Sequence, residues 1–212
     1  MNLPQIGDVR LAFATLFLQR HLSEMMQHND SLTELARTLR GAPGAVGGSN
    51  SGGWQSDKTV FDRKDPAVLA LVQHITTAIR DVSVMPPTQP AAPRLRVRMN
   101  GWVNMIGNGD YNTPHFHAGS TWSGVYYVRA GVAISQSKHI NNGAIEFLDP
   151  RAACEMNFGS QSHAQRIVVP PRDGLLLLFP GYLGHFVHPY NGSGERISIA
   201  FNCIIGDAQA DH

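Results

Sequence analysis

The sequence predicts a mainly β (α+β) fold, a β-sandwich or jelly-roll barrel with N-terminal helices packed against one face. Three observations predict this class. Helical patterns occur only before residue 94, short segments of period two follow, and turn residues are plentiful, with 21 Gly and 13 Pro in 212 residues. One hydrophobic core suffices for this length. We expect a single domain over 1–212, with a helical buttress and Gly-rich loop in 1–93 and the barrel in 94–205.

The composition gives no sign of a strongly charged partner. A formal net charge of +1 creates no field that would attract nucleic acid or an anionic membrane. The apolar run 11–18 is too short to span a bilayer, and no small-residue cleavage site follows it. Cys154 and Cys203 have apolar neighbours, so we expect buried free thiols and no disulfide framework. These features predict a cytoplasmic protein.

Two helices are expected in the N-terminal part. The first begins at Ser31, which forms a capping box with Glu34, and Gly41 can close it. The second follows Asp65 as N-cap, with Pro66 at the first helical position. Their apolar faces consist of Leu32, Leu35, Ala36 and Leu39 in the first helix and Val68, Val72, Ile75 and Ile79 in the second.

The segment 41–56 between these helices contains six glycines, which predicts a loop. Its position ahead of the histidine-containing segments makes it a candidate lid, and a plain connector is the alternative.

From Arg94 onward the hydrophobic period is two. Leu95, Val97 and Met99 alternate with arginines, which indicates a strand with one solvated face. Further strands are expected at 122–129, 143–148, 165–169, 175–179, 185–188 and 196–203.

Three histidines form a candidate metal site. In a strand, His115 and His117 would face the same way, roughly 6.5–7 Å apart, so their imidazoles could converge on one ion. His185 follows an apolar strand and a Pro-Gly turn, and it completes a ligand set typical of zinc, iron or copper. His188 would face the opposite side of an extended segment, so we expect it at the surface or behind the ligands.

The strand 196–203 offers a candidate anion site. Arg196 and Ser198 share a face with Ala200, and that face would line a cavity. A guanidinium pairs with a carboxylate through two parallel bonds, and a hydroxyl can add a third. Tyr127 could reach the same ligand if its strand face points inward, although packing in the core is its alternative role.

The chain resembles the iron(II)/2-oxoglutarate-dependent oxygenase superfamily, and in particular a group with a His-x-His motif and prolyl-hydroxylase-like features. The run Asn-x-x-His-x-His-x-Gly-x-x-Trp-Ser-Gly-Val-Tyr-Tyr-Val of that group matches residues 112–128, and its later signature matches Phe179, Pro180, His185, Arg196 and Ser198. The resemblance covers 95–203 well. It implies a double-stranded β-helix, a cupin-like jelly-roll barrel.

The resemblance also implies the chemistry. His115, His117 and His185 would bind Fe(II), and 2-oxoglutarate would chelate it through the keto acid, with its far carboxylate on Arg196, Ser198 and Tyr127. With O2, such an enzyme would hydroxylate an unactivated C–H bond and release succinate and CO2. The substrate would be a small molecule or a peptide, and the sequence does not define it or the oligomeric state.

One departure from the superfamily pattern leaves an alternative open. His117 stands where a carboxylate ligand is usual, so Asp110 could approach the metal instead. An all-histidine set also resembles three-His cupin-type dioxygenases and isomerases, which do not use 2-oxoglutarate. A non-enzymatic jelly-roll binding module with incidental histidines is a third hypothesis.

Overall fold

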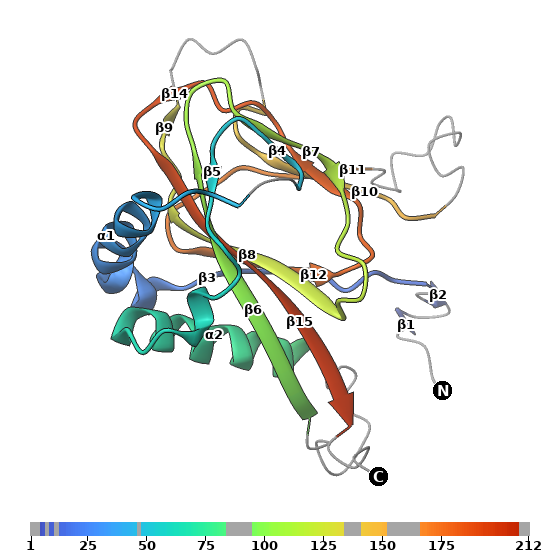
Figure 1. Ribbon diagram of the computed structural model, residues 1–212. Helices are drawn as coiled ribbons and strands as arrows, with labels where there is room; N and C mark the ends of the chain where they lie inside the picture. Colours follow the sequence, from blue (N-terminus) through green and yellow to red (C-terminus); the bar gives the residue numbers. More distant parts are fainter. Residues whose placement is uncertain are drawn as a thin grey trace.

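The computed structural model describes residues 5–6, 9–10, 13–45, 48–83, 95–133, 141–151 and 166–207. It consists of two antiparallel sheets that face each other, with helices on one outer side (Figure 1). The helical segments are η1 (Ser23–His28), α1 (Asn29–Arg40), η2 (Val60–Asp62) and α2 (Pro66–Ser83). This arrangement confirms the predicted helix-buttressed jelly-roll barrel.

The major sheet has six strands in the order β3-β12-β8-β15-β6-β5. Its strands are β3 (Leu18–His21), β5 (Trp54–Gln55), β6 (Leu95–Ile106), β8 (Trp122–Arg129), β12 (Leu175–Pro180) and β15 (Arg196–Asp207). The centre of the sheet is the antiparallel pairing of β6 with β15, which runs from Leu95↔Asp207 to Ile106↔Arg196. This long pairing gives the site a rigid floor.

The minor sheet has five shorter strands in the order β11-β10-β13-β7-β4. Its strands are β4 (Asn50–Ser51), β7 (Tyr111–His115), β10 (Ile145–Leu148), β11 (Arg166–Val169) and β13 (His185–Val187). The remaining strands form two-stranded pairs, β1 (Gln5–Ile6) with β2 (Val9–Arg10) and β9 (Val132–Ala133) with β14 (Gly192–Ser193). The glycine-rich segment is thus not a plain loop, because β4 and β5 add a strand to each sheet.

The helices differ in how well the sequence predicted their ends. α2 begins as expected, with the Asp65 carboxylate accepting a hydrogen bond from the Ala67 amide at 2.9 Å. The capping box at Ser31 is wrong: α1 begins at Asn29, and its N-cap residue His28 makes no side-chain cap bond. Contacts between Asn29 and β8 determine where α1 begins. The buried Asn29 side chain donates to the Val128 carbonyl at 2.9 Å and accepts from the Tyr126 hydroxyl at 2.8 Å.

Side-chain alternation in the major sheet builds two separate hydrophobic cores. On β12, Leu176 and Leu178 face the helices, whereas Leu175, Leu177 and Phe179 face the minor sheet. Both faces of the strand are buried, which explains its continuous apolar run. The helix-side core also contains Ile197, Ile199 and Phe201, so their neighbours on β15 must face the space between the sheets.

The other strand predictions are close to the structure, and β8 has the predicted bounds. Cys203 is a buried free thiol, as expected, while Cys154, Arg94 and most of the 130–142 and 150–164 loops lie outside the described residues. No described helix is both long enough and apolar enough to cross a membrane.

Candidate active site

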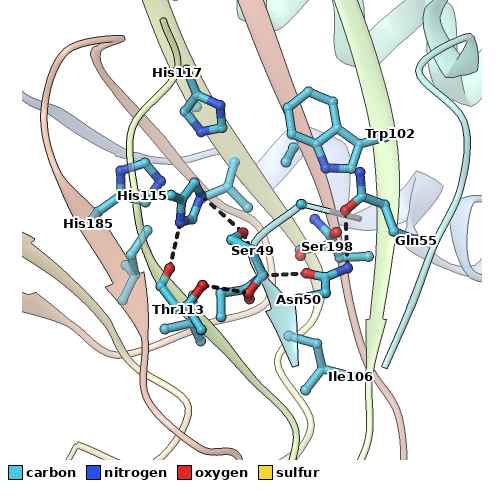
Figure 2. Close-up of a pocket in the computed structure, with 18 of the residues that line it drawn as sticks. Ser49, Asn50, Gln55, Trp102, Ile106, Thr113, His115, His117, His185 and Ser198 are labelled. Atoms are coloured by element: carbon cyan, nitrogen blue, oxygen red, sulfur yellow. Dashed lines mark hydrogen bonds between the residues drawn. The ribbon is translucent and has the colours of Figure 1, made fainter. Parts of the chain in front are cut away.

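A cavity of about 410 Å³ opens between the two sheets and collects all the residues predicted for the site. The major sheet and its flanks contribute Gln55, Trp102, Asn104, Ile106, Gly124, Val125, Tyr127, Phe179, Arg196, Ser198 and Ala200. The minor sheet and its flanks contribute Gly48, Ser49, Asn50, Asn112, Thr113, Pro114, His115, Phe116, His117, Ile145, His185 and Val187, and Lys58 lies at the rim. The histidines gather on one side, and Trp102, Gln55 and Ser198 lie on the other (Figure 2).

His115, His117 and His185 come together at one end of the minor sheet. Their ring centroids are 4.3 Å apart for His115 and His185 and 5.2 Å for each of the other two pairs. One ligand nitrogen from each ring lies within 4.8 Å of the others. Within the described residues, these three side chains form the only group of this kind that could hold a metal ion.

The register of the sheet explains why His115 and His185 meet, because they are direct partners across β7 and β13. The strand argument for His117 is wrong, since β7 ends at His115 and His117 lies in the turn that follows. The His117 amide donates to the Gly181 carbonyl at 2.8 Å. A Cβ atom on Gly181 would lie 2.3 Å from the Ser120 carbonyl oxygen, so only glycine allows this approach. The Pro-Gly turn before His185 therefore holds His117 as well.

Backbone carbonyls fix the tautomers of two histidines. The Nδ1 atoms of His115 and His185 lie 2.8 Å from the carbonyl oxygens of Thr113 and Leu183, respectively. A carbonyl only accepts, so each Nδ1 carries the proton and each Nε2 presents its lone pair. This arrangement orients both rings as metal ligands.

Burial keeps the three imidazoles neutral at physiological pH. It lowers the pKa of His115, and it lowers the pKa of His117 to about 4, where repulsion of a proton by Lys58 and by His115 in its protonated form adds to the effect of burial. Burial likewise lowers the pKa of His185 to about 3, with a further contribution from His115. Since a metal binds the neutral imidazole, this donor set fits a divalent transition metal.

Asp110 does not supply the carboxylate that the superfamily pattern would require. Its Oδ2 accepts a hydrogen bond from the Gly107 amide at 2.8 Å, in a separate pocket that Arg40 and Glu195 also line. Among the described residues that line the main cavity there is no aspartate or glutamate. Within the described residues, the candidate ligand set is therefore all histidine.

Arg196 lies at the inner part of the same cavity. The residue is 2% exposed, and its guanidinium lies over the Tyr127 ring, 5.1 Å from the ring centre. Its Nε has no hydrogen-bond partner, and no carboxylate pairs with it in the described part of the chain. A buried cation without a counter-ion is costly, so this site fits an anionic ligand.

Three strands present polar groups in one row beside Arg196. The register places Ser198 opposite both Tyr127 and Asn104, so their side chains share the inner face of the sheet. Burial raises the pKa of Tyr127, which keeps its hydroxyl protonated and able to donate. The Asn104 Oδ1 is buried without a partner in the described residues. Arg196, Ser198 and Tyr127 thus converge as predicted, and Asn104 joins them.

Sequence reasoning missed the residues at the cavity mouth. Ser49 Oγ lies 3.3 Å from His115 Nε2, and Lys58 Nζ lies 5.3 Å from the centre of the Trp102 ring. Both belong to segments without a motif, and only pairing of β4 and β5 with the sheets brings them to the site. The glycine-rich segment 41–56 thus forms a wall of the cavity.

His188 lies outside the metal cluster. Its Nε2 is 2.7 Å from the Glu146 carboxylate, which is buried on β10 and also pairs with Arg166 at 3.3 Å. The prediction that His188 faces away from the ligands is correct.

The fold and the site define a jelly-roll protein with a cluster of three histidines that could hold a metal ion and, in the same cavity, a buried arginine. Residues 100–202 match the family described as "Putative 2OG-Fe(II) oxygenase". No curated protein matches the sequence. The segment 100–202 is thus similar in sequence to the iron(II)/2-oxoglutarate-dependent oxygenases.

Solved structures show the same fold at low sequence identity. A prolyl-4-hydroxylase from Pseudomonas putida has a TM-score of 0.59 and 15% identity, over 89% of this chain and 92% of that chain. A viral collagen prolyl hydroxylase from Paramecium bursaria Chlorella virus-1, in complex with 2-oxoglutarate, has a TM-score of 0.56 and 13% identity, over 88% and 94%. The α-ketoglutarate-dependent epimerase SnoN from nogalamycin biosynthesis has a TM-score of 0.58 and 15% identity, over 92% and 79%.

Proposed function

We propose that this protein is an iron(II)- and 2-oxoglutarate-dependent oxygenase that hydroxylates an unactivated C–H bond of a small molecule or peptide, with release of succinate and CO2. One observation carries the proposal: three neutral imidazoles and a buried arginine without a counter-ion line the same cavity. The first set fits a divalent metal, and the second fits the carboxylate of a co-substrate.

His115, His117 and His185 would hold the metal through nitrogen atoms. For His115 and His185 these are the Nε2 atoms, because the Thr113 and Leu183 carbonyls occupy the Nδ1 protons. Phe147 and Phe179 pack against the His185 ring, with centroids 5.6 and 4.8 Å away, and limit its rotation. A bound iron(II) ion, together with 2-oxoglutarate and O2, supplies the oxidising chemistry.

Arg196 would pair with the far carboxylate of 2-oxoglutarate, and Ser198 and Tyr127 would donate hydrogen bonds to it. The inner position of Arg196, at 2% exposure, suits a ligand that enters deeply and leaves its other end near the histidines. Burial of these donors in a low-dielectric pocket strengthens the ion pair and excludes water from that end of the cavity.

The three-His cupin-type enzyme is the competing function, and the all-histidine ligand set favours it. Such an enzyme would bind iron or another divalent metal but would not respond to 2-oxoglutarate. SnoN, which has the same fold, is an epimerase, so a reaction other than hydroxylation is also possible. This question is tested after 2-oxoglutarate binding has been measured.

The first test is an anaerobic titration. Iron(II) is added to metal-free protein, followed by 2-oxoglutarate, and the visible charge-transfer band of keto acid chelation is recorded. We expect a saturable band in the wild type and in Arg98→Ala, an exposed arginine on the same sheet, and no band in Arg196→Ala. Iron binding without a band in the wild type would favour the cupin-type function.

Milder variants guard against misfolding of Arg196→Ala. Ser198→Ala and Tyr127→Phe each remove one hydroxyl and should weaken 2-oxoglutarate binding about fivefold to tenfold. This factor corresponds to the loss of one hydrogen bond, about 1–1.4 kcal/mol of binding free energy. Aerobic succinate release with candidate substrates, followed by mass analysis for an added oxygen atom, then separates hydroxylation from other outcomes.

A further inference from the structure

The charge balance of the cavity points to the chemistry of the primary substrate, on the basis of the function proposed above. The described lining contains two cations, Arg196 and Lys58, the three histidines, which bind a metal as neutral imidazoles, and no acid. A divalent metal adds two positive charges, and the 2-oxoglutarate dianion removes two. The loaded cavity therefore retains two positive charges, one of which lies at Lys58.

Lys58 is an exposed cation that lines the cavity, whereas Arg196 is buried. Lys58 Nζ lies 5.3 Å from the centre of the Trp102 ring, and that ring is 6.0 Å from the His117 ring. Trp102 is only 6% exposed, so the indole is a fixed platform beneath the cation. Lys58 has no carboxylate partner in the described part of the chain.

A chain of amides directs a second donor to the same place. Asn112 Nδ2 donates to Asn50 Oδ1, and Asn50 Nδ2 donates to Gln55 Oε1 at 3.0 Å. These bonds occupy the oxygen of Gln55 and leave its Nε2 without an acceptor among the described residues. Gln55 pairs with Asn104 on β6, two residues from Trp102, so the Gln55 side chain lies on the same face of the sheet as the Trp102 ring (Figure 2).

We propose that the substrate carries a carboxylate that binds at the cavity mouth above Trp102, with one oxygen on Lys58 Nζ and the other on Gln55 Nε2. A cation and a planar amide donor match the two oxygens of a carboxylate. The carboxylate neutralises part of the remaining positive charge, and it anchors the substrate next to the histidine cluster, since Trp102 adjoins His117.

The test uses the three lysines of the chain, Lys58, Lys64 and Lys138, as reporters. The protein is loaded with zinc(II) and saturating 2-oxoglutarate, its lysines are dimethylated with ¹³C, and the Lys58 signal is assigned with Lys58→Arg. A panel of N-acetyl amino acids is titrated, each compared with its own carboxamide. Saturation with 2-oxoglutarate beforehand prevents the probes from occupying the Arg196 pocket.

We expect acids of the panel to shift the Lys58 signal saturably, their amides to leave it in place, and the Lys64 signal not to move. By calorimetry, Lys58→Gln should weaken binding of the best acid at least tenfold, and Lys64→Gln should leave it unchanged. Equal shifts by acids and amides, equal movement of Lys64, or no shift by any acid would overturn the proposal.

Failure of the proposed function gives a different pattern. If 2-oxoglutarate does not bind, the anaerobic band is absent, and the same titration without 2-oxoglutarate still decides whether Lys58 receives a carboxylate.

Discussion

Ser49 Oγ lies 3.3 Å from His115 Nε2, the nitrogen that His115 presents to a metal. The hydroxyl donates to this lone pair, so a metal ion must displace it. A neutral hydrogen bond contributes about 1 kcal/mol, which corresponds to a factor of about five in affinity. We expect Ser49→Ala to bind iron(II) or cobalt(II) up to about fivefold more tightly, as measured by anaerobic competition with a chromogenic chelator.

Ser51→Ala is the matched control, because Ser51 belongs to the same segment and lies on β4 away from the histidines. Weaker metal binding in Ser49→Ala would show instead that the hydroxyl holds His115 in position.

Removal of any one of the three clustered histidines should abolish stoichiometric metal binding. His115→Ala, His117→Ala and His185→Ala each leave two ligands, so we expect a loss of metal affinity of at least about 100-fold. His188→Ala should retain one metal ion per chain, because His188 contacts Glu146 outside the cluster. Elemental analysis of protein purified without a histidine tag measures this. Equal loss in His188→Ala would contradict the assignment of ligands.

Arg196→Met should stabilise the ligand-free protein. The variant removes a buried cation without a counter-ion and keeps a side chain of similar length. We expect a gain of about 1–3 kcal/mol in the free energy of unfolding, which raises Tm by several degrees for a chain of this size.

The ligand should reverse this order of stability. At 100 times its Kd, 2-oxoglutarate should stabilise metal-loaded wild type by about 2.7 kcal/mol and Arg196→Met not at all. Scanning calorimetry with and without 2-oxoglutarate records both effects. A lower Tm of the ligand-free variant would mean that packing against Tyr127 outweighs the buried charge.

The buried thiol of Cys203 should make stability fall at alkaline pH. Burial raises the pKa of Cys203 to about 11, above the value of 9.0 that applies in the unfolded chain. Between these values the unfolded thiol ionises and the folded thiol does not, so ionisation favours unfolding as pH rises. From pH 7 to pH 10, the wild type should lose about 1 kcal/mol more of its unfolding free energy than Cys203→Ala does. Urea titrations at both pH values measure this difference, and Cys154 is present in both proteins. Equal losses of unfolding free energy in the wild type and in Cys203→Ala would show that ionisation of this thiol does not contribute to the pH dependence.

Local patterns in the sequence predicted most of the barrel. β8, β12 and β15 follow from alternation and apolar runs, because both faces of these strands are buried and every side chain has a defined side. The cavity position of Arg196 and Ser198 follows from the same alternation, since Ile197 and Ile199 occupy the helix-side core.

What the sequence could not predict depends on contacts between distant segments. Ser31 has good capping chemistry, but the bonds from Asn29 to Val128 and Tyr126 start the helix earlier. Lys58 carries no motif, and its place over Trp102 becomes visible only when β5 pairs with β6. Asp110 is close in sequence to the histidines, yet its bond to the Gly107 amide directs it to another pocket.

The pairing of His115 with His185 joins two segments roughly seventy residues apart in the sequence. An ion shared by these side chains would act as a cross-link, because it closes this long loop and lowers the conformational entropy of the unfolded chain. It would do so in the sheet built from the shorter strands, which is the part expected to open first when the protein fluctuates. Metal binding would thus change the order in which the two sheets unfold. Hydrogen exchange at the amides of β7 and β13 would slow on metal binding far more than exchange at the amides of β6 and β15.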